Sequence, residues 1–201
     1  MARNASANNP TCRSDLRLPT NMRLIEAGPL RLEPLVPDHA AEMFGMLSDP
    51  AIYEFENSPP ESEAWLHARY VRLARRGPAD GTQIWLNWVI RLPDDGAAGY
   101  VQATVLPEGC ALIAYELASR FWRRGIAGAA VTTMLEELRE HYAIHTAVAV
   151  LKSANYRSLG LLRKLGFAPA DEATLRRFRD MPDESVLLRI LSPTNNPADF
   201  P

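Results

Sequence analysis

The chain has 201 residues, a formal net charge of −2, and a composition that is 47% hydrophobic and 23% charged. This length and balance fit one globular domain with a sizeable core. The near-neutral charge argues against nucleic acid as the main partner, because such proteins usually carry a basic face. No apolar run approaches the roughly 18 residues of a membrane helix, and the N-terminus lacks the apolar stretch of a signal peptide.

The cysteines and the two chain ends set the expected surroundings and the domain limits. Cys12 and Cys110 are too few for a disulfide framework, which indicates free thiols in a reducing cytoplasm. Residues 1–21 are rich in Asn, Ala, Ser, Arg and Pro without periodicity, and residues 192–201 carry three prolines. Both ends are expected to be flexible tails around one folded domain, residues 22–191.

The first elements are an expected strand and two expected helices. Residues 30–35 alternate apolar and polar side chains, which is typical of a strand. A helix should start at Pro37, with Asp38 as its N-cap. A second helix should start at Ser58-Pro59-Pro60-Glu61, which has the form of a capping box with proline in the first turn.

The rest of the chain predicts a meander and then alternating strands and helices. Strands are expected over residues 84–92, 99–106 and 110–118, and their short turns indicate antiparallel pairing. The remaining expected elements are a helix (126–141), a strand (146–151), a helix (155–165) and a strand (185–191). This order predicts an α/β fold with a mixed sheet.

A small-residue turn joins the last meander strand to the long helix. The sequence Trp122-Arg123-Arg124-Gly125-Ile126-Ala127-Gly128-Ala129-Ala130 opens that helix. Unpaired N–H groups at a helix N-terminus, together with the helix dipole, favour a bound phosphate. Alone, the turn could equally be a packing feature.

A second motif follows about 27 residues later, Asn155-Tyr156-Arg157-Ser158 leading to Lys164-Leu165-Gly166-Phe167. The ordered pair of motifs resembles the GNAT family of acetyl-CoA-dependent N-acetyltransferases over residues 22–191. Trp122 stands where most of the family has Gln or Arg. The aromatic pair Phe121-Trp122 before the turn resembles the subgroup similar to ribosomal-protein N-terminal acetyltransferases, where such a pair is common. The resemblance implies a twisted mixed sheet of about six or seven strands with helices on both faces.

The resemblance also implies a set of residues that hold acetyl-CoA as co-substrate. Backbone N–H groups of the turn would bind its pyrophosphate, and Asn155 and Ser158 would lie at the pantetheine. The N–H groups of Leu117 and Ala118 would polarise the thioester carbonyl where two parallel strands splay apart. The implied cofactor-binding residues are Leu117, Ala118, Arg123, Arg124, Gly125, Ile126, Ala127, Gly128, Ala129, Asn155 and Ser158.

Glu116 is the candidate general base. It lies on the strand that leads to the phosphate turn and shares a face with Leu112 and Ala114. Partial burial should raise its pKa, so that it could accept a proton from an ammonium group through water. A surface or salt-bridged glutamate is the alternative. Many family members have a tyrosine acid where this chain has Leu162, so an inactive CoA-binding sensor is the alternative function.

The acceptor is expected to be a primary amine, on a small molecule or at a protein N-terminus, and the protein a monomer or homodimer. Three aromatic residues could line the bottom of the acceptor cleft, although at least one of them should pack in the core; they are Trp85, Trp88 and Tyr100. Four acidic residues of residues 54–63 could attract a cationic amine or simply form a solvated loop; they are Glu54, Glu56, Glu61 and Glu63. His141 and His145 lack a further ligand in the sequence pattern, so no metal is expected.

Overall fold

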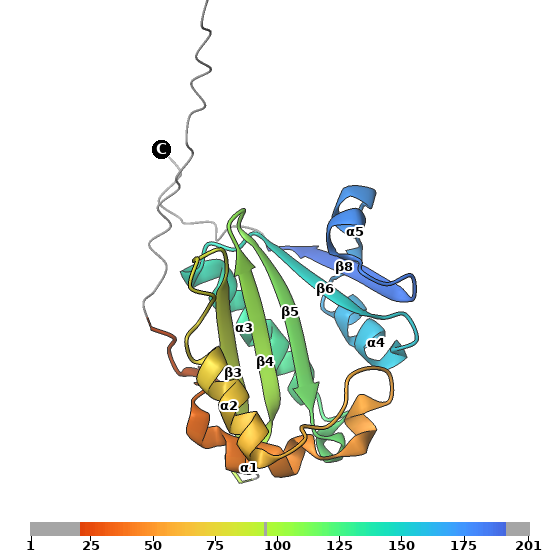
Figure 1. Ribbon diagram of the computed structural model, residues 1–201. Coiled ribbons are helices and arrows are strands. Elements are labelled where there is room, and N and C mark those ends of the chain that lie inside the picture. Colours follow the sequence, from red (N-terminus) through yellow and green to blue (C-terminus); the bar gives the residue numbers. More distant parts are fainter. Residues whose placement is uncertain (1–20, 95, 192–201) are drawn as a thin grey trace, which may run out of the picture.

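A computed structural model of the chain describes residues 21–94 and 96–191 (Figure 1). The expected tails, Asn21 excepted, and Cys12 lie outside these residues. Within the described ranges the strands form one sheet of eight, in the order β1-β2-β3-β4-β5-β6-β8-β7. The strands are β1 (Ile25–Ala27), β2 (Leu30–Pro34), β3 (Ile84–Leu92), β4 (Gly96–Leu106), β5 (Cys110–Leu117), β6 (Thr146–Lys152), β7 (Ala168–Pro169) and β8 (Glu184–Ile190).

The predicted mixed sheet is confirmed. All neighbouring strands pair antiparallel except β5 and β6, which are parallel. The meander β3-β4-β5 forms as its short turns predict. The sheet has more strands than the six or seven expected because β1 and β7 are only three and two residues long, too short to show a period in the sequence.

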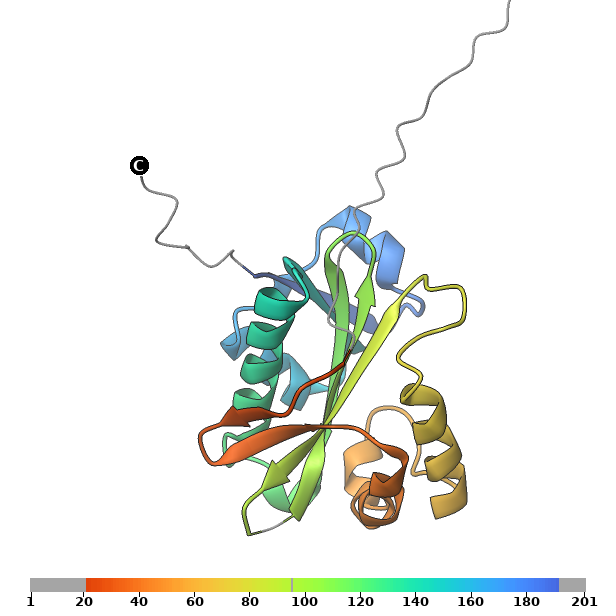
Figure 2. The same cartoon turned by 90° about the vertical axis from the view of Figure 1, so that its left-hand side faces the viewer.

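Helices cover both faces of the sheet, as expected. In Figure 2, α1 (Ala40–Leu47) and α2 (Glu63–Leu73) lie on one side and α3 (Ile126–His141) on the other. The helix α4 (Tyr156–Lys164) follows β6, and α5 (Glu172–Phe178), which the sequence did not predict, packs Leu175 and Phe178 over Val148 and Val186. In the described part of the chain there are also three 3-10 turns: η1 (Pro37–His39), η2 (Pro50–Tyr53) and η3 (Ser119–Phe121).

Two predicted helix starts were wrong. The residues from Pro37 form the 3-10 turn η1, so Asp38 does not cap an α-helix. The helix α2 begins at Glu63, where the hydroxyl of Ser62 accepts a hydrogen bond from the Trp65 N–H (3.1 Å). Two consecutive prolines at 59 and 60 keep the backbone extended, so the cap moves to the next serine along the chain.

The helix α3 has the bounds that its pattern predicts. Ala130, Val131, Met134 and Leu138 are fully buried against the sheet and recur at helical spacing. Burial of this continuous apolar stripe holds α3 against the sheet and thereby fixes the position of its N-terminal turn.

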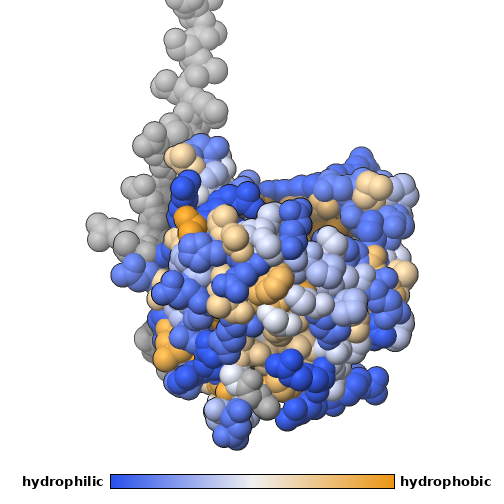
Figure 3. Space-filling model, turned by 60° about the horizontal axis from the view of Figure 1, so that its bottom comes forward, coloured by the Kyte–Doolittle hydropathy of each residue, from blue (hydrophilic) through white to orange (hydrophobic). Residues whose placement is uncertain are grey.

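The surface at the end of the molecule where β5 leads into α3 mixes polar and apolar residues (Figure 3). Across residues 21–94 and 96–191, no helix is both long enough and apolar enough to cross a bilayer.

Candidate active site

The opening between β5 and β6 is the central feature of the site. The two parallel strands pair only from Cys110 with Thr146 to Leu112 with Val148. Beyond these residues β5 runs on to Leu117 and β6 to Lys152, and the strands separate (Figure 1). The splay that the sequence analysis expected at this place is therefore present, and it leaves one edge of β5 facing an opening.

The backbone at the end of β5 offers one donor to this opening. The Ala118 N–H donates to the Ala98 carbonyl (2.9 Å) on the β4 side. Successive N–H groups of a strand point to opposite edges, so the Leu117 N–H points toward β6. The Trp122 indole N–H donates to the Leu117 carbonyl (2.8 Å) and holds this end of the strand. Ala118 was thus wrong as a free donor, because the sheet already uses its N–H.

The turn before α3 has the geometry of a small-residue anion site. Gly125 is the N-cap of α3 with φ +79°, and a Cβ built on it would meet no atom within 4 Å. The positive φ favours glycine, and the open space above it leaves the backbone exposed. The Ala129 N–H already donates to the Gly125 carbonyl (3.0 Å) as the first bond of the helix. Ala129 was therefore wrong as a phosphate donor, which leaves the N–H groups of the preceding residues.

The helix α4 supplies the other wall of the opening. The Asn155 side chain accepts a hydrogen bond from the Ser158 N–H (3.0 Å), so the predicted N-cap is confirmed. The Tyr115 hydroxyl donates to the Ser158 carbonyl (3.5 Å) across the opening. Leu162 is fully buried and brings no proton donor from this helix.

A single cleft of about 1340 Å³ connects these parts. It is lined by most of the residues that the sequence singled out, together with the candidate base. They are Glu116, Leu117, Arg123, Gly125, Ile126, Ala127, Gly128, Asn155 and Ser158. Arg124 does not line it; its guanidinium carbon lies 5.4 Å from the centroid of the Phe121 ring.

Glu116 sits at the inner end of this cleft, opposite Tyr100 of β4. Burial raises the pKa of Glu116 to about 7, while a hydrogen bond from the Tyr100 hydroxyl and the charge of Arg69 oppose that rise. A carboxyl that titrates near neutral pH can be ionised and still accept a proton from an amine. The geometry therefore suits the role predicted for it.

The comparisons with known proteins agree with this geometry. The family model described as Acetyltransferase (GNAT) domain matches residues 29–168. The chain belongs to the GNAT acetyltransferase family. Its enzyme class is accordingly that of the acetyl-CoA-dependent N-acetyltransferases. No protein among the curated sequences matches it.

Solved structures share the GNAT fold with this chain at low sequence identity. The ribosomal L7/L12 alpha-N-protein acetyltransferase RimL in complex with coenzyme A has a TM-score of 0.69 and 15% identity, over 84% of this chain and 98% of that one. The microcin C7 self immunity acetyltransferase MccE with acetyl-CoA and AMP has a TM-score of 0.67 and 14% identity, over 82% and 93%. A spermidine N-acetyltransferase SpeG chimera from Vibrio cholerae and hSSAT has a TM-score of 0.64 and 16% identity, over 81% and 95%.

The three aromatic residues divide between the cleft and the core, as expected for at least one of them. Tyr100 lines it, but Trp88 is fully buried and its indole N–H donates to the Arg23 carbonyl (3.2 Å) on the α3 side. Neighbouring strand residues point to opposite faces, so Trp88 and its partner Val101 turn away from the cleft. Trp85 does not line the cleft either.

The residues that sequence reasoning missed come from α2 and β4. The helix α2 presents Arg69 and Tyr70 to the cleft, at positions that only helical packing reveals. Gly99 lets β4 approach Glu116, since a Cβ there would lie 2.1 Å from the Glu116 carbonyl oxygen. A glycine at a strand interior is the one signal in the sequence that could have indicated this close approach.

The segment after η2 lines the cleft and contacts α4. Glu54 forms an ion pair with Arg157. The Phe55 ring packs edge-on against the Tyr156 ring, with 5.7 Å between the ring centroids. Arg157 also lies over the Trp122 ring, 4.7 Å from its centroid. Of the four acidic residues, only Glu56 lines the cleft, while Glu54, Glu61 and Glu63 are exposed, which agrees with the alternative of a solvated loop.

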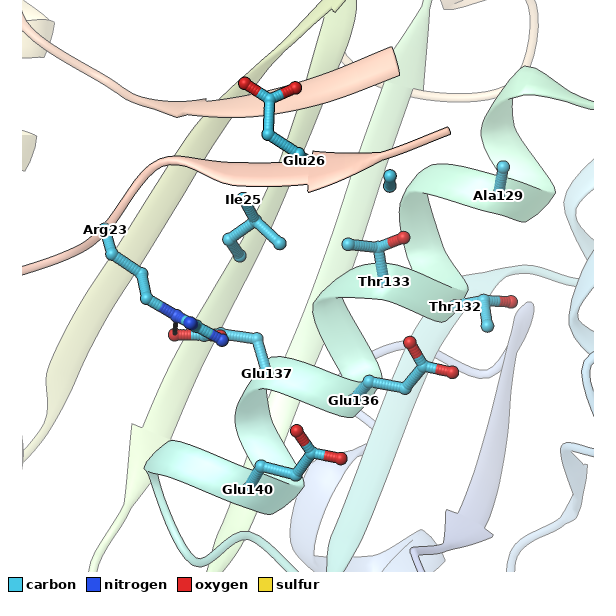
Figure 4. Close-up of a pocket in the computed structure, with 10 residues that line it drawn as sticks. Arg23, Ile25, Glu26, Ala129, Thr132, Thr133, Glu136, Glu137 and Glu140 are labelled. Atoms are coloured by element: carbon cyan, nitrogen blue, oxygen red, sulfur yellow. Dashed lines mark hydrogen bonds and ion pairs between the residues drawn. The ribbon is translucent and has the colours of Figure 1, made fainter. Parts of the chain in front are cut away.

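A second hollow of about 480 Å³ lies between β1 and α3 (Figure 4). Arg23 reaches across it to the buried Glu137 (2.6 Å), which also faces His141 (3.3 Å). His145 instead contacts Thr146 (3.1 Å). No group of three metal-ligating side chains occurs in the described part of the chain. The Arg23–Glu137 ion pair across this hollow links the segment before β1 to α3.

Proposed function

We propose that the protein transfers the acetyl group of acetyl-CoA to a primary amine by direct attack in a ternary complex. The observation that carries this proposal is Glu116, a half-buried carboxyl at the inner end of the cleft that also holds the α3 turn. Acetyl-CoA would lie along the opening between β5 and β6, with its pyrophosphate at the N–H groups of Ile126, Ala127 and Gly128.

The chemistry divides between backbone and side chains. Glu116 would take a proton from the ammonium group, since only the neutral amine attacks a thioester. The amine nitrogen bonds to the carbonyl carbon, and the Leu117 N–H would stabilise the oxyanion. The C–S bond then breaks and the CoA thiolate leaves, and the proton that the nitrogen loses as the amide forms would protonate the thiolate.

No acetylated enzyme is needed for this path. Cys110 is buried in a separate apolar cluster with Val148 and Val186, and it does not line the cleft. Burial raises the pKa of the Cys110 thiol, which disfavours the nucleophilic thiolate.

We place the reaction in the cytoplasm, and the protein stays predicted as a monomer or homodimer.

The test is release of free CoA thiol from acetyl-CoA in the presence of a panel of small amines and peptides. A ternary complex predicts intersecting lines in double-reciprocal plots, and mass spectrometry should find no acetylated protein without amine. Parallel lines together with an acetylated cysteine would overturn direct attack.

The second candidate function is a CoA-binding sensor without turnover. The observation that favours it is Leu162, whose buried side chain brings no acid to α4. Binding of acetyl-CoA with no thiol release across the whole panel would support the sensor and refute the transferase.

A further inference from the structure

Arg69 is placed as an unpaired cation in the acceptor half of the cleft. Its guanidinium carbon lies 5.8 Å from the centroid of the Trp65 ring, one turn earlier on α2. Among the described residues no carboxylate forms an ion pair with it, whereas the half-buried Arg91 pairs with both Glu33 and Glu42. Glu56 and Glu116 line the same cleft, but neither forms an ion pair with Arg69, so this half-buried guanidinium can bind a carboxylate from a ligand.

The neighbouring Tyr70 gives a second, independent sign of a missing ligand. Its side chain is only 3% exposed and lines the cleft, yet its hydroxyl has no hydrogen-bond partner among the described residues. Leaving a buried hydroxyl unpaired costs free energy, and a polar ligand group would remove that cost.

The surrounding groups narrow the chemistry of that ligand. Arg69 is close enough to Glu116 to lower the pKa of that carboxyl against the effect of burial. An acceptor with a second positive charge beside its amine would meet repulsion from Arg69. An acceptor whose amine has a neighbouring carboxylate would offer one group to Glu116 and the other to Arg69.

We propose that the acceptor is a small amine that also carries a carboxylate, as an α-amino acid does. Arg69 would bind the carboxylate, the Tyr70 hydroxyl would donate to the same group, and Glu116 would face the amine. This inference rests on the proposed function and names its substrate class. It disfavours diamines and the N-termini of peptides, whose amines have no adjacent carboxylate.

The experiment compares matched acceptors at saturating acetyl-CoA. Each set contains an amino acid, its carboxamide and the amine without the carboxyl group, for one aromatic and one sulfur-containing side chain; a peptide is added. We expect kcat/KM for the acids to exceed that for the amides, amines and peptide by about 10–100-fold, the range of a charged hydrogen bond. Equal values, or preference for the peptide, would overturn the inference.

Two variants test the residues themselves. Arg69→Gln should lower kcat/KM for the acids to the level of the amides, and Arg69→Lys should restore part of the preference. Tyr70→Phe should raise KM for the acids by several-fold with little change in kcat. Arg72→Gln on the exposed side of α2 is the matched control and should keep the preference. A preference that survives Arg69→Gln would overturn the assignment.

The outcomes separate this inference from the proposed function. If acetyl-CoA binds and the amides are acetylated at the same rate as the acids, only the proposed substrate class is refuted. If no amine of any kind is acetylated, both the substrate class and the proposed function are refuted. Circular dichroism of each variant confirms that the fold is kept, and binding of acetyl-CoA to each confirms that the cofactor half is intact.

Discussion

The two halves of the cleft are built from different parts of the polypeptide. In the cofactor half, backbone groups face the opening, at the end of β5 and at the turn before α3. In the acceptor half, side chains from α2, β4 and β5 converge, with Arg69, Tyr100 and Glu116 around one space. A backbone site tolerates most side-chain changes but no bulk at its glycine, whereas a side-chain site can change its ligand through single substitutions.

This difference predicts which property each kind of substitution should change. Changes at the α3 turn should weaken binding of acetyl-CoA without regard to the amine. Changes at the acceptor half should alter the rate or the choice of amine and leave binding of the cofactor intact.

The largest effect on binding of the cofactor should come from Gly125→Glu. Glutamate would hold a negative charge near the pyrophosphate, and like charges at 4 Å repel by about 4 kcal/mol near a protein surface. The dissociation constant for CoA, measured by calorimetry, should rise at least about 100-fold. Gly81→Glu is the matched control, since Gly81 also has a positive φ (+66°) and open space but does not line the cleft. Unaltered affinity in Gly125→Glu would show that the turn serves packing alone.

Glu116→Gln should lower the transfer rate at neutral pH by about 10²–10⁴-fold, the usual loss of a general base. Affinity for acetyl-CoA should hardly change. In the unmodified protein the rate should rise with pH through about 7, as Glu116 ionises. The deficit of the variant should shrink at higher pH, where more amine is already neutral. A constant deficit at every pH would assign Glu116 to positioning the amine instead.

The same variant should change how stability depends on pH. Because the pKa of Glu116 in the folded protein, about 7, lies above its ordinary value, folding favours the protonated form. That stabilisation is present below about pH 4.5 and is lost as pH rises through 7. Glu116→Gln should therefore be more stable than the unmodified protein at pH 8, by about 3 kcal/mol, and similar to it at pH 4.5. Urea denaturation at both pH values measures this, and equal stability at pH 8 would contradict a buried carboxylate.

Acetyl-CoA at 100 times its dissociation constant should stabilise the protein by about 2.7 kcal/mol. The thermal midpoint reports this. The Gly125→Glu variant should show no rise at the same concentration, while Glu116→Gln should show the full rise. An unchanged midpoint of the unmodified protein at saturation would refute binding of the cofactor altogether.

The smallest effect should come from Asn155, which lies where α4 meets the opening. Asn155→Ala should cost about 1 kcal/mol of stability through loss of the N-cap. Asn155→Ser should keep the cap and restore most of that stability. If the serine variant still binds CoA more weakly than the unmodified protein, the amide itself contacts the cofactor; if its affinity is normal, Asn155 only caps the helix.

Local sequence predicted the turn before α3 and the helix itself well because their geometry is local. The turn from Trp122 to Gly128 and the amphipathic pattern of α3 are contiguous, so a motif and a period describe them. The errors there concern single N–H groups. Ala118 and Ala129 bond within the sheet and the helix, which depends on the edge of a strand and on helix phase rather than on residue type.

The acceptor half could not be predicted in the same way. Arg69 and Glu116 are 47 positions apart in the sequence and come together only because α2 and β5 line the same cleft. The two tryptophans of β3 have the same residue type but different surroundings, and the register of the sheet sends Trp88 into the core. Strand alternation places the two tryptophans on opposite faces, but it does not say which face is buried.

The sequence by itself therefore determined the order of the longer elements, the bounds of α3 and the small-residue turn before it, because hydrophobic period and glycine conformation are properties of adjacent residues. Tertiary structure alone decided which N–H groups stay free, where the sheet opens, and that Arg69, Tyr70 and Glu116 share one space. The physical reason is that hydrogen-bond partners and burial depend on which distant segments pack together.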